Sequence, residues 1–176
     1  EIKETENAQP LIVAAGLVGA LPLFPHPSDA FNKVAVTAGH SVGELTAAAG
    51  ARAITAESAM VLVRERGKAM AEASARVATG MSAVLGGERD LVIAAIEKFG
   101  LTAANENGAG QIVAAGELGS LEQFSAHAPE GSRVRSLAVA GAFHTHYMSS
   151  AVERLAMLSR SVTVRDPRTR LLSNKD

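Results

Sequence analysis

The sequence predicts an α/β fold with a second, smaller unit inserted into it. One observation is a strand-like run at residues 34–37 that leads into a glycine-rich turn and a helix-prone stretch. The other is the order of elements from residue 79 to 140, which reads βαββαβ, the ferredoxin-like pattern. The predicted boundaries are 1–77 and 141–176 for an incomplete α/β core and 78–140 for the ferredoxin-like subdomain.

The core elements follow from periodicity and proline placement. Residues 4–23 predict a helix, because apolar side chains recur there at helical spacing, among them Leu11 and Val18. The prolines that follow predict a loop, at Pro22, Pro25 and Pro27. After the strand at 34–37, residues 44–51 predict a helix. Thr55 is a predicted N-cap for a longer helix that ends near residue 74.

The remaining elements belong to the insert and to the chain that follows it. The insert has strand-like segments at 81–85, 101–104, 111–115 and 133–139 and helix-like segments at 88–99 and 118–126. After it, residues 147–160 predict a helix, 162–164 a short strand or a turn, and 170–172 the start of a strand. Because the chain starts at Glu1 without methionine and stops after that strand, we expect a fragment whose flanking pieces are missing.

Composition excludes several classes of protein. The 176 residues are 47% hydrophobic and carry a formal net charge of −1, whereas nucleic-acid binding needs clustered lysine and arginine. No cysteine is present, which excludes disulfides and thiolate catalysis. The apolar stretch at 11–24 is too short to span a bilayer. We expect a cytoplasmic protein that has no metal or cofactor and binds neither nucleic acid nor membrane.

Residues 39–43 match the pattern G-x-S-x-G between a strand and a helix. A nucleophile on such a sharp turn needs small neighbours, and the turn exposes the hydroxyl of Ser41. The Val42 N–H at the start of the helix is then placed to stabilise an oxyanion. The alternative is an ordinary glycine-rich turn. His40 is adjacent to Ser41 and is expected to be a supporting hydrogen-bonding group, not its base.

A nucleophilic serine needs a general base. The candidates are His26, His127, His144 and His146. His144 and His146 follow the insert where the chain enters a helix, and a helix N-terminus favours the neutral imidazole that a base requires. Residue physics does not decide between these two, and a capping or surface role is open for each.

Arg66 falls on the apolar face of its predicted helix, with Leu62, Val63 and Met70. A guanidinium on that face needs an anion, and its planar fork suits a carboxylate. Either an internal salt bridge or a substrate carboxylate satisfies this requirement. The neighbouring residues Arg64, Glu65 and Lys68 are expected to face solvent.

These residues together resemble a known family. Residues 39–44 (GHSVGE) resemble the GHSxGE nucleophile motif of malonyl-CoA:acyl carrier protein transacylases. The likeness continues through residues 63–70 (VRERGKAM), 80–86 (GMSAVLG), 105–113 (NENGAGQIV) and 142–144 (AFH). Four or more ordered motifs make the resemblance far more specific than the serine motif alone.

The resemblance implies a hydrolase-like α/β core with the ferredoxin-like subdomain inserted. It implies an acyl-serine enzyme in which Ser41 carries malonyl from coenzyme A to acyl carrier protein, for fatty acid or polyketide synthesis, with His144 as base. It further implies that Arg66 binds the malonyl carboxylate. Other residues implied near the substrate are Gln9, Asn105, Asn107 and Phe143, and Phe143 favours malonyl over methylmalonyl.

Departures from the family pattern keep alternatives open. The family's N-terminal Gly-Gln-Gly-x-Gln segment, which completes the oxyanion hole, does not occur here, so weak or no activity is expected of the isolated chain. A serine hydrolase or thioesterase would share Ser41 and His144 without needing Arg66. An acyltransferase domain of a larger synthase and a non-catalytic scaffold are further alternatives.

Overall fold

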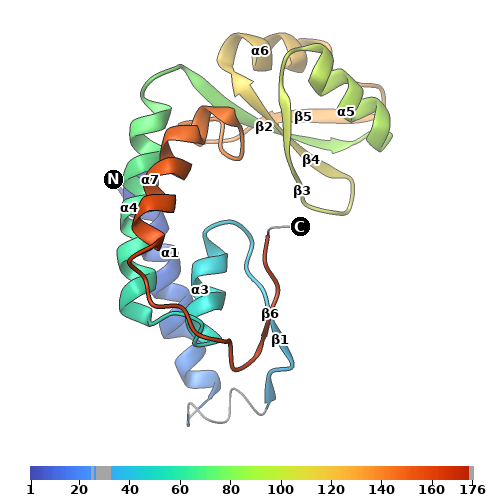
Figure 1. Ribbon diagram of the computed structural model, residues 1–176. Coiled ribbons are helices and arrows are strands. Elements are labelled where there is room, and N and C mark those ends of the chain that lie inside the picture. The colour runs from blue at the N-terminus through green and yellow to red at the C-terminus, as the bar shows by residue number, and fades with distance from the viewer. Residues whose placement is uncertain (25, 27–32, 175–176) are drawn as a thin grey trace. The chain divides into compact units, whose positions relative to one another are not determined.

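The structure is a computed structural model that describes residues 1–24, 26 and 33–174. It has a mixed α/β fold, and the chain divides into two compact units (Figure 1). The first unit contains Glu1–Lys68 and Glu153–Asp176, and the second contains Ala69–Val152. The predicted subdomain at 78–140 therefore falls within the second unit.

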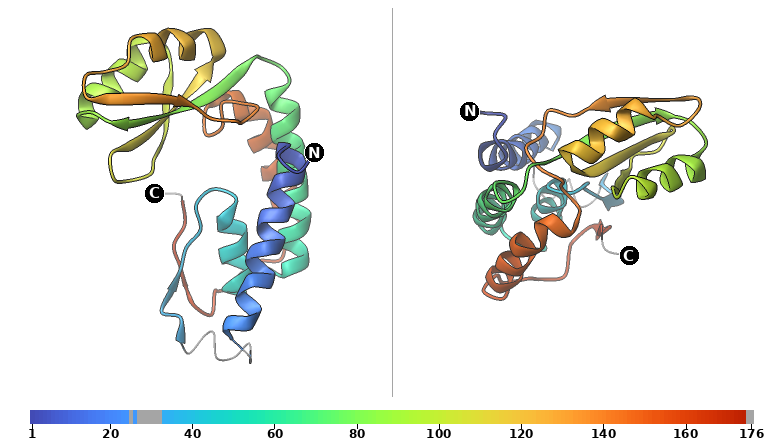
Figure 2. Two further views of the ribbon diagram at one scale, coloured as in Figure 1. Left: turned by 180° about the vertical axis from the view of Figure 1, so that it is seen from behind. Right: turned by 90° about the horizontal axis from the view of Figure 1, so that it is seen from above.

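Three helices pack together in the first unit: α1 (Thr5–Ala20), α3 (Gly43–Gly50) and the part of α4 (Ala56–Ser74) that ends at Lys68. Their core contains Val13 of α1 and Ala59 and Val63 of α4, each fully buried. Figure 2 shows α1 and α4 running alongside each other. The predicted N-cap is confirmed, because Thr55 Oγ1 accepts a hydrogen bond from the Ser58 N–H at 3.1 Å.

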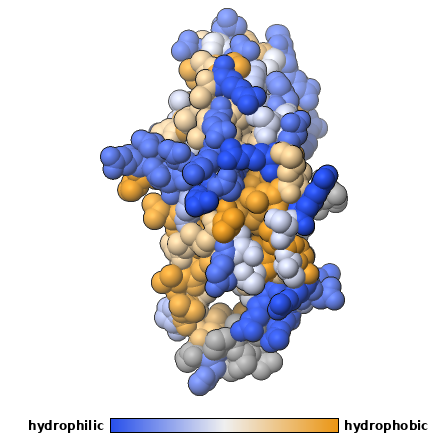
Figure 3. All heavy atoms as spheres, turned by 60° about the vertical axis from the view of Figure 1, so that its left-hand side comes forward, coloured by the Kyte–Doolittle hydropathy of each residue, from blue (hydrophilic) through white to orange (hydrophobic). Residues whose placement is uncertain are grey.

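The buried face of α1 differs from the apolar stripe that its periodicity indicated. Gln9 and Val13 are its buried residues, whereas Leu11 and Val18 are more than half exposed. Figure 3 shows apolar residues, in orange, at the surface on one face of the molecule. Apolar spacing alone did not identify the core-facing side, because that side carries a polar residue, Gln9.

Helix α1 ends at Ala20, before the predicted end at residue 23. A 3₁₀ turn, η1 (Leu21–Leu23), follows the helix and contains Pro22. Pro25 and Pro27, which were predicted to continue a loop here, lie outside the described residues.

A short parallel sheet completes the first unit. Strand β1 (Val36–Thr37) pairs with β6 (Arg170–Leu171), and the Leu172 N–H extends the ladder to the Thr37 carbonyl at 3.0 Å. The predicted strand at 34–37 is thus present but shorter. Its pairing lays the last described residues along the turn that follows β1.

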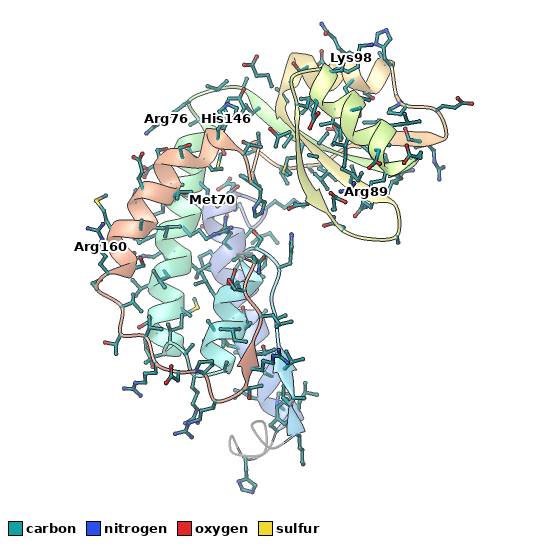
Figure 4. All side chains as sticks on the ribbon, turned by 45° about the vertical axis from the view of Figure 1, so that its right-hand side comes forward. Met70, Arg76, Arg89, Lys98, His146 and Arg160 are labelled. Carbon is teal, nitrogen blue, oxygen red and sulfur yellow. The ribbon has the colours of Figure 1, made fainter. Side chains whose placement is uncertain are left out.

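The second unit contains the predicted βαββαβ order. Its elements are β2 (Thr79–Gly86), α5 (Arg89–Lys98), β3 (Thr102–Glu106), β4 (Gln111–Glu117), α6 (Leu118–Ala126) and β5 (Ser132–Ser136). The strands form one antiparallel sheet in the order β3-β4-β2-β5. Figure 4 labels Arg89 and Lys98, which mark the two ends of α5.

The two faces of this sheet bury different partners. Val84, Ile112 and Ala114 pack with α5 and α6 around the fully buried Phe124. The alternate residues, including Met81 and Val113, pack on the other face with Ala142 and Phe143. The period-two alternation of a strand therefore places the segment around residue 143 against the sheet.

The last helical region begins with a 3₁₀ turn, η2 (His146–Met148), and continues as α7 (Ser149–Ser159). Residues 162–164, for which a short strand or a turn was open, form no strand. The chain instead turns at Ser161 and Val162, whose N–H groups donate to the Leu158 and Ser159 carbonyls.

Candidate active site

Ser41 lies at the sharpest point between β1 and α3. Its φ is +54°, a left-handed conformation that is uncommon for a residue with a side chain. The Gly43 N–H donates to the His40 carbonyl at 2.9 Å, and the Glu44 N–H donates to the Ser41 carbonyl at 3.1 Å. The predicted strand–turn–helix context of the serine is therefore present, with the strain that marks functional turns.

The two glycines of the motif play different parts. A Cβ on Gly39 would lie 2.0 Å from the Gly43 carbonyl oxygen, so only glycine fits there, as predicted. A Cβ on Gly43 would meet nothing within 4 Å, so the expectation of a clash at this position was wrong. Gly43 opens helix α3 with its Cβ position facing open space, while its carbonyl lies against Gly39.

The two N–H groups at the serine differ in their partners. The Ser41 N–H donates to Asn174 Oδ1 at 2.8 Å. For the Val42 N–H, at the N-cap of α3, no acceptor is found in the part of the chain that the structure describes. The oxyanion role of Val42 remains a prediction, and of the two groups Val42 is the one with hydrogen-bonding capacity left.

Arg66 contacts the serine directly. Its Nη2 donates to Ser41 Oγ at 2.9 Å, and its Nη1 donates to Gln9 Oε1. Gln9 is only 6% exposed, so α1 supplies a buried amide oxygen that fixes the guanidinium. The structure thus brings together three of the predicted residues, Gln9, Ser41 and Arg66, from α1, the serine turn and α4.

No carboxylate of the described residues forms an ion pair with Arg66. Burial lowers the pKa of Arg66, because desolvation disfavours the charged form. A bound anion would oppose that shift. The internal salt bridge that the sequence left open for Arg66 is therefore not formed in this part of the protein.

The neighbouring Glu65 forms an ion pair instead. Its carboxylate accepts from Arg154 Nη2 of α7 at 2.6 Å and lies 3.2 Å from Arg64 Nη2. The hydrogen bond from Arg154 is the main cause that lowers the pKa of Glu65. Glu65 was expected to face solvent, and this was wrong: its side chain is 17% exposed because α7 covers it.

His144 and Phe143 belong to the second unit. His144 has a φ of +59°, and its neighbours hold that conformation. Thr145 Oγ1 donates to the Ala142 carbonyl at 2.6 Å and accepts from the Tyr147 N–H, while the half-buried Phe143 packs on the clusters around Met70 and Met81. The pairing of His144 with Ser41 remains a prediction.

Two other histidines, His127 and His146, have local contacts of a structural kind. His127 ends α6, where its Nδ1 lies 2.8 Å from the Gln123 carbonyl and its ring stacks on Phe99. His146, labelled in Figure 4, begins η2 with its ring centroid 4.1 Å from that of Tyr147. His40 is exposed at the serine turn, where its carbonyl accepts from Gly43.

Asn105 and Asn107 lie at the β3–β4 hairpin. Asn105 is half-buried beside a register shift in β3, and Asn107 Nδ2 donates to Gln111 Oε1 at 2.9 Å. This contact gives Asn107 a role in the hairpin itself. Their predicted place near a substrate remains untested.

Sequence reasoning missed Asn174. Its Nδ2 donates to the Gly39 carbonyl at 2.6 Å while its Oδ1 accepts from the Ser41 N–H. Next to it, Ser173 Oγ donates to Glu44 Oε1 at 2.8 Å. No local signal marks these residues, because they reach the serine turn only through the pairing of β6 with β1.

The described residues offer neither a metal-binding cluster nor a membrane-spanning helix. Within residues 1–24, 26 and 33–174, no group of three or more His, Cys, Asp or Glu side chains could hold a metal ion. In the same ranges, none of the helices is long and apolar enough to cross a membrane.

The strained serine turn with an arginine beside it defines a candidate serine-nucleophile site, and comparison with known proteins identifies the family. The family described as acyl transferase domain matches residues 31–174, and the chain belongs to this family. The malonyl CoA-acyl carrier protein transacylase of Mycolicibacterium smegmatis is 47% identical over 176 residues, which are all of this chain and 60% of that protein.

Solved structures agree. The crystal structure of MCAT from Mycobacterium tuberculosis has a TM-score of 0.93 and 46% identity, over 99% of this chain and 58% of that one. A malonyl-transacylase in complex with a type II polyketide synthase acyl carrier protein has a TM-score of 0.88 and 27% identity, over 100% and 58%. The chain thus spans about three-fifths of the length of these relatives.

Proposed function

We propose that this chain carries the acyl-transfer site of a malonyl-CoA:acyl carrier protein transacylase. The observation that carries the proposal is the contact of Arg66 Nη2 with Ser41 Oγ at 2.9 Å. It places a guanidinium that has no described carboxylate partner beside a strained serine. An acyl group with a free carboxylate would satisfy both groups at once, its thioester carbon at Ser41 and its carboxylate at Arg66.

The reaction follows in two halves. Ser41 Oγ attacks the carbonyl carbon of malonyl-CoA, its proton passes to the His144 imidazole, and the C–S bond breaks to release coenzyme A, which takes up that proton. The phosphopantetheine thiol of acyl carrier protein then attacks the serine ester. The ester C–O bond breaks, and the thiol proton returns to Ser41 through His144. The Val42 N–H stabilises the oxyanion of each tetrahedral intermediate.

Further parts of the proposal rest on the family and on the named relatives. The core is a hydrolase-like α/β core, and residues 78–140 form a ferredoxin-like subdomain, supported by the strand order β3-β4-β2-β5. The partners are acyl carrier protein and a coenzyme A thioester, in a cytoplasmic fatty acid or polyketide pathway. No cofactor takes part, and Phe143 excludes the methyl branch of methylmalonyl.

The test is intact-protein mass spectrometry of the full-length gene product after brief mixing with malonyl-CoA, with Ser41→Ala as control. We expect a malonyl adduct that maps to Ser41, is absent from the control and disappears on addition of acyl carrier protein. An adduct that decays equally fast in water alone would instead identify a hydrolase. The absence of an adduct would identify a scaffold.

A further inference from the structure

We propose that Asn174 is a positioning residue that holds the serine turn in its reactive shape and leaves the Val42 N–H as the oxyanion donor. The proposal rests on the acyl-serine function above. Its basis is one side chain that bonds the backbone on both sides of His40: Asn174 Nδ2 donates to the Gly39 carbonyl at 2.6 Å, and Oδ1 accepts from the Ser41 N–H at 2.8 Å.

The chemistry of the amide fits this task. The turn offers one acceptor and one donor two residues apart, and a primary amide offers the complementary pair. The same partners fix which end of the amide is nitrogen, since a carbonyl cannot donate and an N–H cannot accept. A carboxylate in the place of Asn174 would lack the donor to Gly39, and an alkyl group would make neither contact.

The two hydrogen bonds of Asn174, together called the clamp, act where the backbone is strained. Ser41 has a φ of +54°, and Gly39 approaches the Gly43 carbonyl so closely that a Cβ on Gly39 would lie 2.0 Å from it. A left-handed serine persists only where surrounding contacts over-determine it. Asn174 supplies two such contacts at the strained point, in addition to the turn bond from the Glu44 N–H to the Ser41 carbonyl.

The strand pairing gives Asn174 its position. Thr37 is in register with Leu171, and the Leu172 N–H donates to the Thr37 carbonyl at 3.0 Å. Ser173 then bonds Glu44 at 2.8 Å, which ties the segment to the first turn of α3. Asn174 is therefore held from the strand side and from the helix side of the serine turn.

The clamp also gives the Ser41 and Val42 N–H groups different roles. Because the Ser41 N–H is bound to Asn174, it is not available to a developing oxyanion, whereas the Val42 N–H is. Arg66, which would hold the substrate carboxylate, bonds the side chains of Gln9 and Ser41, whereas Asn174 bonds the backbone of the turn. Loss of the clamp should therefore slow the chemical step and leave malonyl binding nearly unchanged.

The experiment compares Asn174→Ala, Asn174→Asp and Ser173→Ala in the full-length gene product. Single-turnover acylation of Ser41 by malonyl-CoA gives the maximal rate and the half-saturating concentration, and circular dichroism and Tm report folding. We expect both Asn174 variants to lose roughly 10²-fold in rate with half-saturation within about twofold of wild type. Ser173→Ala removes one tie of the segment and leaves both Asn174 contacts in place, so we expect a smaller loss in rate than in either Asn174 variant.

Wild-type rates in both Asn174 variants would overturn the proposal. So would a loss that appears only in half-saturation, or an equal loss in Ser173→Ala. If Asn174→Ala unfolds, Asn174→Asp carries the test alone, because it keeps the size and the acceptor and replaces the donor to the Gly39 carbonyl with a charged carboxylate oxygen. If wild-type protein forms no malonyl adduct, the proposed function fails instead. The clamp is then tested separately by the rate at which a fluorophosphonate probe labels Ser41, with the same variants and the same expected ratios of rates.

Discussion

Arg66 is hydrogen-bonded to the Ser41 hydroxyl: its Nη2 donates to Ser41 Oγ at 2.9 Å. The other terminal nitrogen of the guanidinium, Nη1, donates a hydrogen bond to Gln9 Oε1. A substrate carboxylate that binds Arg66 would compete for the nitrogen that now holds the hydroxyl. On the proposed function, binding of the acyl group and release of the Ser41 oxygen for attack would therefore be coupled through Arg66.

Replacing Arg66 should separate malonyl from acyl groups without a carboxylate. We expect Arg66→Ala to lower the rate of Ser41 acylation by malonyl-CoA roughly 10- to 150-fold more than that by acetyl-CoA, the range that corresponds to one charged hydrogen-bonding partner. Stopped-time mass spectrometry with both thioesters measures the ratio. Arg64→Ala, on the exposed side of α4, is the matched control. Equal losses for both thioesters would refute the carboxylate role of Arg66.

A carboxylate in place of the Gln9 amide should act as an internal competitor. Gln9→Glu would put an anion against Arg66 Nη1 at a buried position. Arg66 would then have the carboxylate partner that it lacks among the described residues. We expect the KM for malonyl-CoA to rise about tenfold or more, while Gln9→Leu, which adds no charge, raises it less. Steady-state kinetics of the two variants decides this, and a larger effect of leucine would contradict the explanation.

The two glycines of the serine motif should respond oppositely to alanine. Gly39→Ala forces a Cβ onto the Gly43 carbonyl, and we expect it to lower the free energy of unfolding by about 2 kcal/mol or more. Gly43→Ala places its Cβ in open space at the start of α3, so we expect stability within about 1 kcal/mol of wild type. Urea unfolding curves measure both, and similar losses at the two sites would show that the turn geometry is wrong.

The ion pair between Glu65 and Arg154 should make stability depend on pH. Arg154 lowers the pKa of Glu65 below its ordinary value of 4.5, so the folded state favours the carboxylate. The stabilisation is therefore fully present above about pH 4.5 and is lost as the pH falls through the lower, folded pKa. We expect Glu65→Gln to lower Tm at pH 7. We also expect the Tm of this variant to fall less than that of wild type when the pH is lowered.

The control for that experiment is a double-mutant cycle with Arg154→Ala, measured at pH 7 and below pH 4. A coupling between the two substitutions that is present at pH 7 and reduced at low pH supports the assignment. A coupling that does not change with pH would place the origin of the Glu65 stabilisation elsewhere.

Local patterns predicted the parts of this structure that depend on neighbours in sequence. The helix α6 (Leu118–Ala126) has its predicted limits, Thr55 caps α4, and Arg66 extends from the helix face that also carries the buried Leu62 and Val63. Each of these follows from spacing within one element, where propensity, capping and periodicity act together.

What the sequence did not reveal depends on contacts between distant residues. Glu65 was predicted to face solvent, but it is covered by Arg154, which lies 89 positions away in the sequence. The buried side of α1 carries Gln9, which a search for apolar stripes passes over. Asn174 lies 133 positions from Ser41, and only the register of β1 with β6 brings them together. Register between strands is a property of the assembled sheet and has no local signature.

The distance between Ser41 and Asn174 has a consequence for protein synthesis. Translation proceeds from the N-terminus, so the serine emerges from the ribosome 133 residues before the amide that closes its turn. At about 5–20 residues per second, this interval lasts roughly 7 to 27 s. During that time the nascent chain carries Ser41 without the two Asn174 hydrogen bonds, so on the proposed role of Asn174 the serine would not yet have its reactive shape.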